Sequence, residues 1–146
     1  MKTPTYAVEV ITVPVSDVDR AVAFYVDQVG FGLDVDYKPN EAFRVVQLTP
    51  PGSACSIQIG IGLTTAPPGS LQNVYLVVTD IEVARDRLLG LGVKMGDILH
   101  KTPIGAWDGG FASGIDPGRG DYASFADFRD PDGNRWVLQE RGYRNA

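Results

Sequence analysis

The chain has 146 residues, of which 44% are hydrophobic and 21% are charged, a balance typical of a folded globular domain rather than a disordered segment. Its formal net charge of −5 at pH 7 creates no positive field for phosphates, so we expect no nucleic acid and no anionic membrane among its partners. No apolar run approaches the roughly 20 residues of a membrane-spanning helix, and no apolar leader follows a basic start, so we expect a cytoplasmic protein.

Two segments begin helices in the same way. Residues 15–21 (VSDVDRA) and 78–84 (VTDIEVA) both run from a short apolar strand into a hydroxyl residue, with an acid three positions later. We expect Ser16 and Thr79 to cap the two helices, and these acids to close capping boxes. Both helices should end at glycines, which tolerate the left-handed C-terminal conformation: Gly30 in the first, and Gly90 or Gly92 in the second.

After each helix the pattern favours three strands. The predicted strands lie at residues 33–37, 43–49 and 55–62 in the first half, and at 93–99, 122–128 and 135–139 in the second. This repetition predicts one α+β domain over residues 1–146, built from two tandem βαβββ modules at about 5–63 and 71–141 with a linker at 64–70. We expect the modules to form a curled mixed sheet around a concave cleft that takes a ligand, with the helices outside.

These segments resemble the vicinal oxygen chelate superfamily, the group of glyoxalases, bleomycin-resistance proteins and extradiol dioxygenases. Four stretches carry the resemblance: VPVSDVDRAVAFY from Val13, FRVVQLTPPGSACSIQIG from Phe43, LVVTDIEVARDRL from Leu76, and FRDPDGNRWVLQE from Phe128. The resemblance implies the glyoxalase-type fold over nearly the whole chain and a homodimer. It also implies that a small molecule binds in the cleft, and it names no substrate.

In metal-dependent members of that superfamily, equivalent strands of the two halves supply histidine, glutamate or glutamine ligands to a divalent ion. The corresponding positions here hold Val10, Gln58, Asn73 and Val137, of which only the two amides have oxygen donors. A slip of two residues brings Gln139 to the last position without restoring a carboxylate. We therefore expect no metal and no other cofactor. The alternative is a distorted site from Glu9, Gln58, His100 and Glu140; otherwise Glu9 and Glu140 are solvated charges at strand edges.

Strand alternation predicts which residues face the cleft. The predicted ligand-binding residues on the strands are Val10, Thr12, Gln58, Asn73, Tyr75, Val137 and Gln139. Residues 99–121 contain six glycines and favour a long loop acting as a lid. Its apolar members Ile104, Trp107 and Phe111 either close over a flat, conjugated ligand or cover a sheet edge or dimer seam.

Three functions are compatible with this pattern. The first is a resistance-type protein without the usual metal site, which binds and sequesters a small, partly aromatic organic molecule. The second is a metal-independent isomerase, lyase or cyclase of secondary metabolism, in which His100, Tyr75 or a carboxylate carries a proton. The third is a metal-dependent lyase or dioxygenase with unrecognised ligands.

Overall fold

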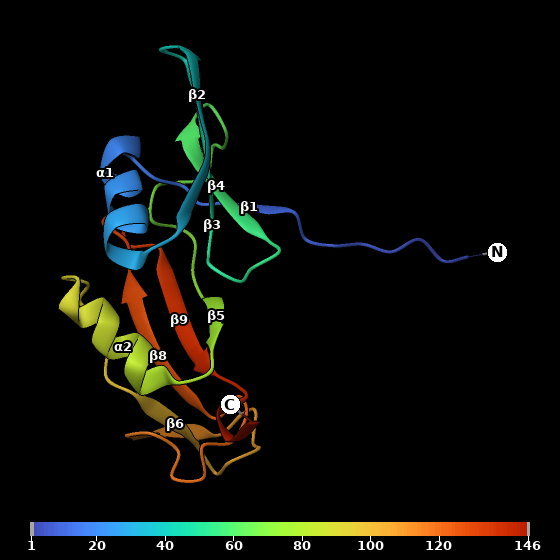
Figure 1. Cartoon of the computed structure of the whole chain (residues 1–146), viewed down its shortest axis with the longest axis vertical. Coiled ribbons are helices and arrows are strands. Elements are labelled where there is room, and N and C mark those ends of the chain that lie inside the picture. The colour runs from blue at the N-terminus through green and yellow to red at the C-terminus, as the bar shows by residue number, and fades with distance from the viewer. Residues whose placement is uncertain (1, 146) are drawn as a thin grey trace. The chain divides into compact units, whose positions relative to one another are not determined.

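The computed structural model describes residues 2–145 and divides into two compact units. The first unit is the chain up to Leu71 together with the turn Asp130–Asn134, and the second is Gln72–Arg129 with the chain from Arg135 onward. Each unit contains one mixed sheet and a helix that packs on it (Figure 1), so the predicted α+β fold is confirmed. Within the described residues, no helix has the length and hydropathy needed to cross a membrane.

The first unit has the strand–helix–three-strand order that the repeat predicts. Its sheet has the order β1-β4-β3-β2, with β1 parallel to β4 and the other neighbours antiparallel. The elements are β1 (Val10–Thr12), α1 (Val18–Val22), the π-helical continuation η1 (Ala23–Val29), β2 (Gly32–Asn40), β3 (Phe43–Thr49) and β4 (Ser56–Ile61).

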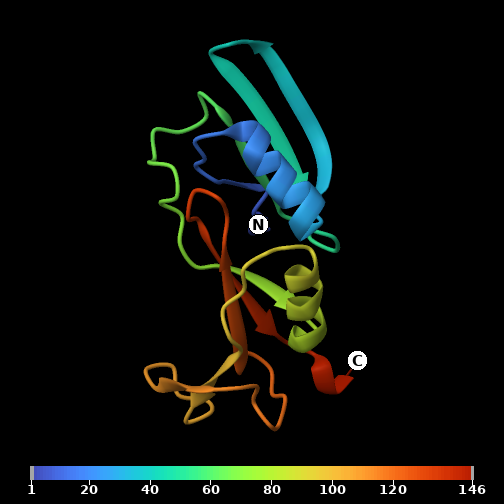
Figure 2. The same ribbon diagram turned by 90° about the vertical axis from the view of Figure 1, so that its left-hand side faces the viewer.

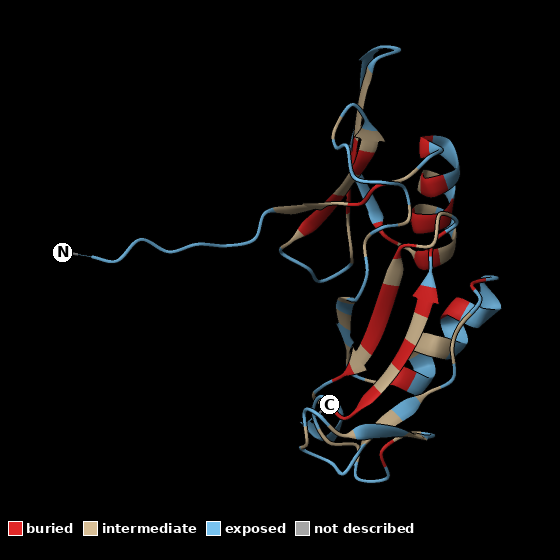
Figure 3. Ribbon diagram, turned by 180° about the vertical axis from the view of Figure 1, so that it is seen from behind, coloured by how far each residue is buried: buried red, intermediate tan, exposed pale blue. Residues whose placement is uncertain are grey.

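The helix of this unit covers one face of the sheet. Buried side chains from α1 and η1, such as Ala21, Phe24 and Tyr25, face the core, which is drawn in red in Figure 3. The helix ends at Gly30, as predicted, because this glycine adopts φ 92° and donates its N–H to the Tyr25 carbonyl at 2.9 Å. The sheet side of the same core consists of Val46, Leu48, Ile57 and Ile59.

Both helices begin one residue later than predicted. Asp17 caps α1 by accepting the Arg20 N–H at 3.1 Å, and Asp80 caps α2 (Ile81–Gly90) by accepting the Val83 N–H at 3.2 Å. The predicted Ser16 cap is wrong, because its hydroxyl donates to Asp132 at 2.6 Å instead.

The predicted capping boxes are also wrong. With aspartate caps, Asp19 and Glu82 occupy the second helical position, and only the third reaches back to the cap N–H. Asp19 instead accepts a hydrogen bond from Arg44 Nη1 at 2.7 Å.

The second unit repeats the plan and adds a strand. Its sheet has the order β5-β9-β8-β6-β7, again with the first pair parallel. Figure 2 shows the added hairpin in orange, beyond the sheet that α2 covers. The elements are β5 (Val74–Val78), α2 (Ile81–Gly90), β6 (Leu99–Thr102), β7 (Gly110–Ser113), β8 (Ser124–Arg129), β9 (Arg135–Glu140) and the 3-10 turn η2 (Tyr143–Asn145).

The region after α2 departs from the sequence prediction in two ways. The strand predicted at 93–99 is reduced to one bridge, Met95 opposite Phe128, and a regular strand starts only at Leu99. The chain passes so close to β8 at Gly96 that a Cβ there would lie 2.0 Å from Asp127 Oδ1. The segment 99–121, predicted as a long loop, contains the β6–β7 hairpin, so the expectation that it has no strands is wrong.

Candidate functional site

Each sheet has one face covered by its helix and one open face. On the open face of the first sheet, Val10 lies opposite Ser56, and Thr12 lies opposite Gln58. The Gln58 amide donates to the Thr12 hydroxyl at 2.8 Å. Within this unit the structure therefore places the predicted residues Val10, Thr12 and Gln58 together on one half-buried, mixed polar and apolar surface.

The open face of the second sheet carries the remaining predicted strand residues. Tyr75 lies opposite Val137, and Gln139 lies two residues farther along β9 on the same face. Tyr75 is 53% exposed, whereas Val137 is only 4% exposed and packs between its neighbours. Asn73 lies at the start of this face, beside Arg135.

An aromatic cluster dominates this second face. Phe125 contacts two rings edge-on: Tyr75 at a centroid distance of 6.4 Å and Phe111 at 5.7 Å. Phe111 is 59% exposed, so the cluster presents ring surface to solvent. The sequence prediction included Tyr75 and Phe111 but missed Phe125. Phe125 lies opposite Gln139, and this pairing between two strands is not visible in the spacing of side chains along either strand.

The β6–β7 hairpin adds a cation to the cluster. Lys101 lies opposite Phe111, and its Nζ sits 4.4 Å from the Trp107 ring centroid and 5.6 Å from that of Phe125. Trp107 is 91% exposed at the hairpin tip. We call Tyr75, Phe125, Phe111, Trp107 and Lys101 the aromatic face. Ile104 is also exposed on this hairpin.

His100 lies on the other side of the same strand. It is opposite Ala112 and Ser124, and its Nδ1 is 2.8 Å from the Gly114 carbonyl oxygen. The two candidate proton carriers, His100 and Tyr75, therefore project from opposite faces of the second sheet and are not brought together.

The positions that correspond to metal ligands do not form a donor set. Val10 and Val137 have no donor atoms, and the Gln58 amide bonds to Thr12. Asn73 accepts a hydrogen bond from Arg135, which also pairs with Asp127 at 2.9 Å. Across residues 2–145, no three His, Cys, Asp or Glu side chains are grouped as a metal site requires. These residues do not fit a divalent ion, which requires several carboxylate, imidazole or thiolate ligands.

Glu140 was expected as a solvated charge, and this expectation is wrong. Its side chain is fully buried and accepts two hydrogen bonds from Arg119, at 2.8 and 2.6 Å. Its carboxylate also accepts the Ile81 N–H at 2.9 Å, at the start of α2. This bidentate bond raises the pKa of Arg119 above its ordinary value. Glu140 thus joins the end of β9 to the start of α2, whereas Glu9 is exposed.

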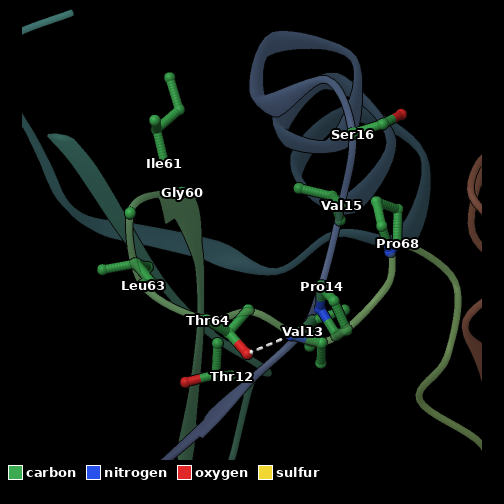
Figure 4. Close-up of a pocket in the computed structure, with 12 residues that line it drawn as sticks. Thr12, Val13, Pro14, Val15, Ser16, Gly60, Ile61, Leu63, Thr64 and Pro68 are labelled. Carbon is green, nitrogen blue, oxygen red and sulfur yellow. Dashed lines mark hydrogen bonds between the residues drawn. The ribbon is translucent and has the colours of Figure 1, made fainter. Parts of the chain in front are cut away.

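A small pocket of about 290 Å³ lies within the first unit (Figure 4). It is bounded by the end of β1, the end of β4 and the loop that follows β4, and it includes the predicted residue Thr12. Most of its side chains are apolar, among them Val15, Ile61 and Leu63, and none is ionisable. Its volume is at the lower limit of ordinary ligand pockets, and the sequence prediction did not identify it.

Comparison with known proteins places this geometry in a family. Residues 7–138 match the model of the Glyoxalase/Bleomycin resistance protein/Dioxygenase superfamily. A search of curated proteins found no match.

Solved structures agree with the family match. The chain is 30% identical to TnmS3, an antibiotic-binding protein from Streptomyces sp. CB03234, with a TM-score of 0.71 over 95% of this chain and 98% of that one. A glyoxalase/bleomycin resistance protein from the same organism is also 30% identical, with a TM-score of 0.67 over 92% and 100%. A superfamily member from Sphaerobacter thermophilus DSM 20745 is 26% identical, with a TM-score of 0.70 over 94% and 98%. The chain therefore belongs to the glyoxalase, bleomycin resistance protein and dioxygenase superfamily.

Proposed function

We propose that this protein binds and sequesters a small, partly aromatic organic molecule, and that the aromatic face of the second unit supplies the contact surface. The observation that carries this proposal is Phe125 with Tyr75 and Phe111 edge-on around it, on a sheet face open to solvent. The similarity to TnmS3, an antibiotic-binding protein, supports it. The absence of a fitting donor set at the family's metal positions favours binding over metal-assisted chemistry.

The size of the face limits the affinity that it provides alone. A tricyclic molecule that buries about 200 Å² of apolar surface against these rings gains roughly 5 kcal/mol, at about 25 cal/mol per Å². Because association also costs translational and rotational freedom, the dissociation constant from this contact alone is no tighter than a few tenths of a millimolar. Micromolar binding therefore requires a second surface over the ligand, such as the concave cleft predicted from the repeat.

We propose that a homodimer forms as part of this function. Strand β2 is exposed along its whole length, and its apolar side chains Leu33, Val35 and Tyr37 are 51%, 43% and 56% exposed. A long edge strand with exposed apolar side chains needs protection from uncontrolled pairing. Light scattering after size-exclusion chromatography measures the mass, and a single species of 15.7 kDa at micromolar concentration would contradict the dimer.

The binding proposal is tested by titrating the protein with a panel of polycyclic aromatic antibiotics and measuring the heat of binding and the intrinsic tryptophan fluorescence. At least one member should bind in the micromolar range. Phe111→Ala should weaken that binding about tenfold, because one ring contact with its buried area is lost. The matched control is Val83→Ala on α2, a residue 65% exposed and remote from the aromatic face.

The same samples separate binding from catalysis. After prolonged incubation, mass spectrometry should recover the bound antibiotic unchanged. Time-dependent product formation would instead favour the metal-independent isomerase, lyase or cyclase. Equal affinity of Phe111→Ala and the parent protein for every bound antibiotic would overturn the assignment of the aromatic face.

A further inference from the structure

Lys101 occupies an unusual place on the aromatic face. Its ammonium lies against two rings, Trp107 at 4.4 Å and Phe125 at 5.6 Å, and its side chain is half-buried. Within residues 2–145, no carboxylate oxygen lies within the 4.0 Å that defines an ion pair with its Nζ. A cation–ring contact leaves N–H donors of the ammonium directed away from the rings, where a ligand oxygen would accept them.

Arg135, another cation on this sheet face, already has a carboxylate partner. Arg135 pairs with Asp127 and also donates to Asn73. Gln139 is a neutral amide, and Asp108 follows Trp107 at the exposed hairpin tip. The face therefore combines flat apolar ring surface with one cation that lacks a carboxylate partner in the described part of the chain.

We propose that Lys101 selects ligands with an acidic oxygen on the aromatic ring system, namely aromatic carboxylates or ionised phenols and enols. The inference rests on the binding function proposed above and specifies its ligand class. A flat ligand that stacks beside Phe125 places a ring substituent near the Lys101 ammonium, because both groups contact the same surface. A charge-assisted hydrogen bond to that substituent is worth about tenfold to a hundredfold in affinity.

The test compares two fused-ring probes of nearly equal shape, anthracene-2-carboxylate and anthracene-2-carboxamide, by isothermal titration calorimetry at low and high salt. The carboxylate should bind at least tenfold more tightly, and the difference should shrink as salt screens the charge. Lys101→Met, which retains the aliphatic stem, should weaken binding of the carboxylate at least tenfold more than binding of the carboxamide, and so remove the preference. Lys101→Arg should retain the preference.

The outcomes distinguish this inference from the binding function itself. Equal affinity of the parent protein for the two probes would overturn the role of Lys101 and leave the aromatic face as a neutral binding surface. A preference for the carboxylate that persists in Lys101→Met would also overturn the role of Lys101, because another group would then bind the carboxylate. Failure of both probes and all antibiotics to bind would overturn the binding function, and this inference with it.

Discussion

The buried ion pair of the second unit provides the sharpest test of the structure. Glu140 is fully buried, and Arg119 donates two parallel hydrogen bonds to it while remaining 14% exposed. Arg119 also lies 3.5 Å from the Tyr143 ring centroid. Replacing Arg119 with methionine preserves the length and much of the apolar stem but leaves the Glu140 carboxylate buried without its countercharge.

The expected cost follows from this burial. Removing one partner of a buried ion pair costs about 3–5 kcal/mol, whereas neutralising both partners costs much less. Because Arg119 retains some solvent contact, we expect about 3 kcal/mol for Arg119→Met. For a chain of this size that loss lowers Tm by roughly 6–12 °C. Adding Glu140→Gln to this variant should recover part of the loss, since the amide oxygen still accepts the Ile81 N–H and no buried charge remains.

Urea unfolding measures these changes in the free energy of unfolding. All variants carry Trp107→Phe, so that the fluorescence comes from Trp136, which is 1% exposed on β9. The matched control is Arg141→Met, an exposed arginine that lies next to Glu140 in the chain and should unfold like the parent. Two results would refute the reasoning. One is an Arg119→Met variant as stable as the parent, and the other is a double variant less stable than Arg119→Met alone.

Three further predictions concern the helix caps, the stability at acid pH and the response to metal ions. Asp80→Ala should lower the free energy of unfolding by about 1 kcal/mol, whereas Thr79→Ala should leave it unchanged. If urea unfolding showed instead that only Thr79→Ala is destabilising, Thr79 rather than Asp80 would be the cap of α2. The hydrogen bond from Arg44 lowers the pKa of Asp36 in the folded protein. The stability that this bond contributes is therefore present at neutral pH and is lost as pH falls through the pKa of Asp36 in the folded state. Asp36→Asn should therefore cost less than about 1 kcal/mol at pH 7, and this cost should disappear in acid as the Asp36 carboxyl becomes protonated in the folded protein. About 1 mM nickel, zinc or manganese should not raise Tm, since a micromolar site would add about 4 kcal/mol.

The repeat made the fold predictable from sequence. In each half the sequence predicts an apolar strand, a helix with an acidic start and three further strands, because such local signals are carried by side-chain spacing alone. The structure adds a fourth strand after the helix of the second unit. The exact cap was less accessible, because Ser16 and Asp17 are both good N-caps. The Asp132 carboxylate, 116 positions away, takes the serine hydroxyl, and sequence spacing does not reveal such a contact.

The candidate site was predictable in part for the same reason. Alternation along the strands predicted that Thr12 shares a face with Gln58 and that Tyr75 shares a face with Val137, because a strand has a strict period of two. The strand registers agree with this expectation. The sequence did not identify Phe125 as a site residue, because its neighbours are defined by the register between β8 and β9. The β6–β7 hairpin was not predicted, because its glycines, such as Gly109 and Gly110, favour loops. Its pairing also depends on the contact between β6 and β8, which sequence spacing does not reveal.

In the second unit, the positions that correspond to metal ligands lie in surroundings that do not suit a divalent ion. Val137 is almost fully buried between Tyr75 and Asp127, which lie opposite it on either side. A carboxylate at position 137 would therefore lose solvent and face the negative charge of Asp127. Arg135 meanwhile holds both Asn73 and Asp127, so the oxygens nearest that position already accept hydrogen bonds from a cation. Val137→Glu alone would therefore not create a chelating site, because the neighbouring Asn73 and Asp127 oxygens accept hydrogen bonds from a guanidinium that repels a divalent ion.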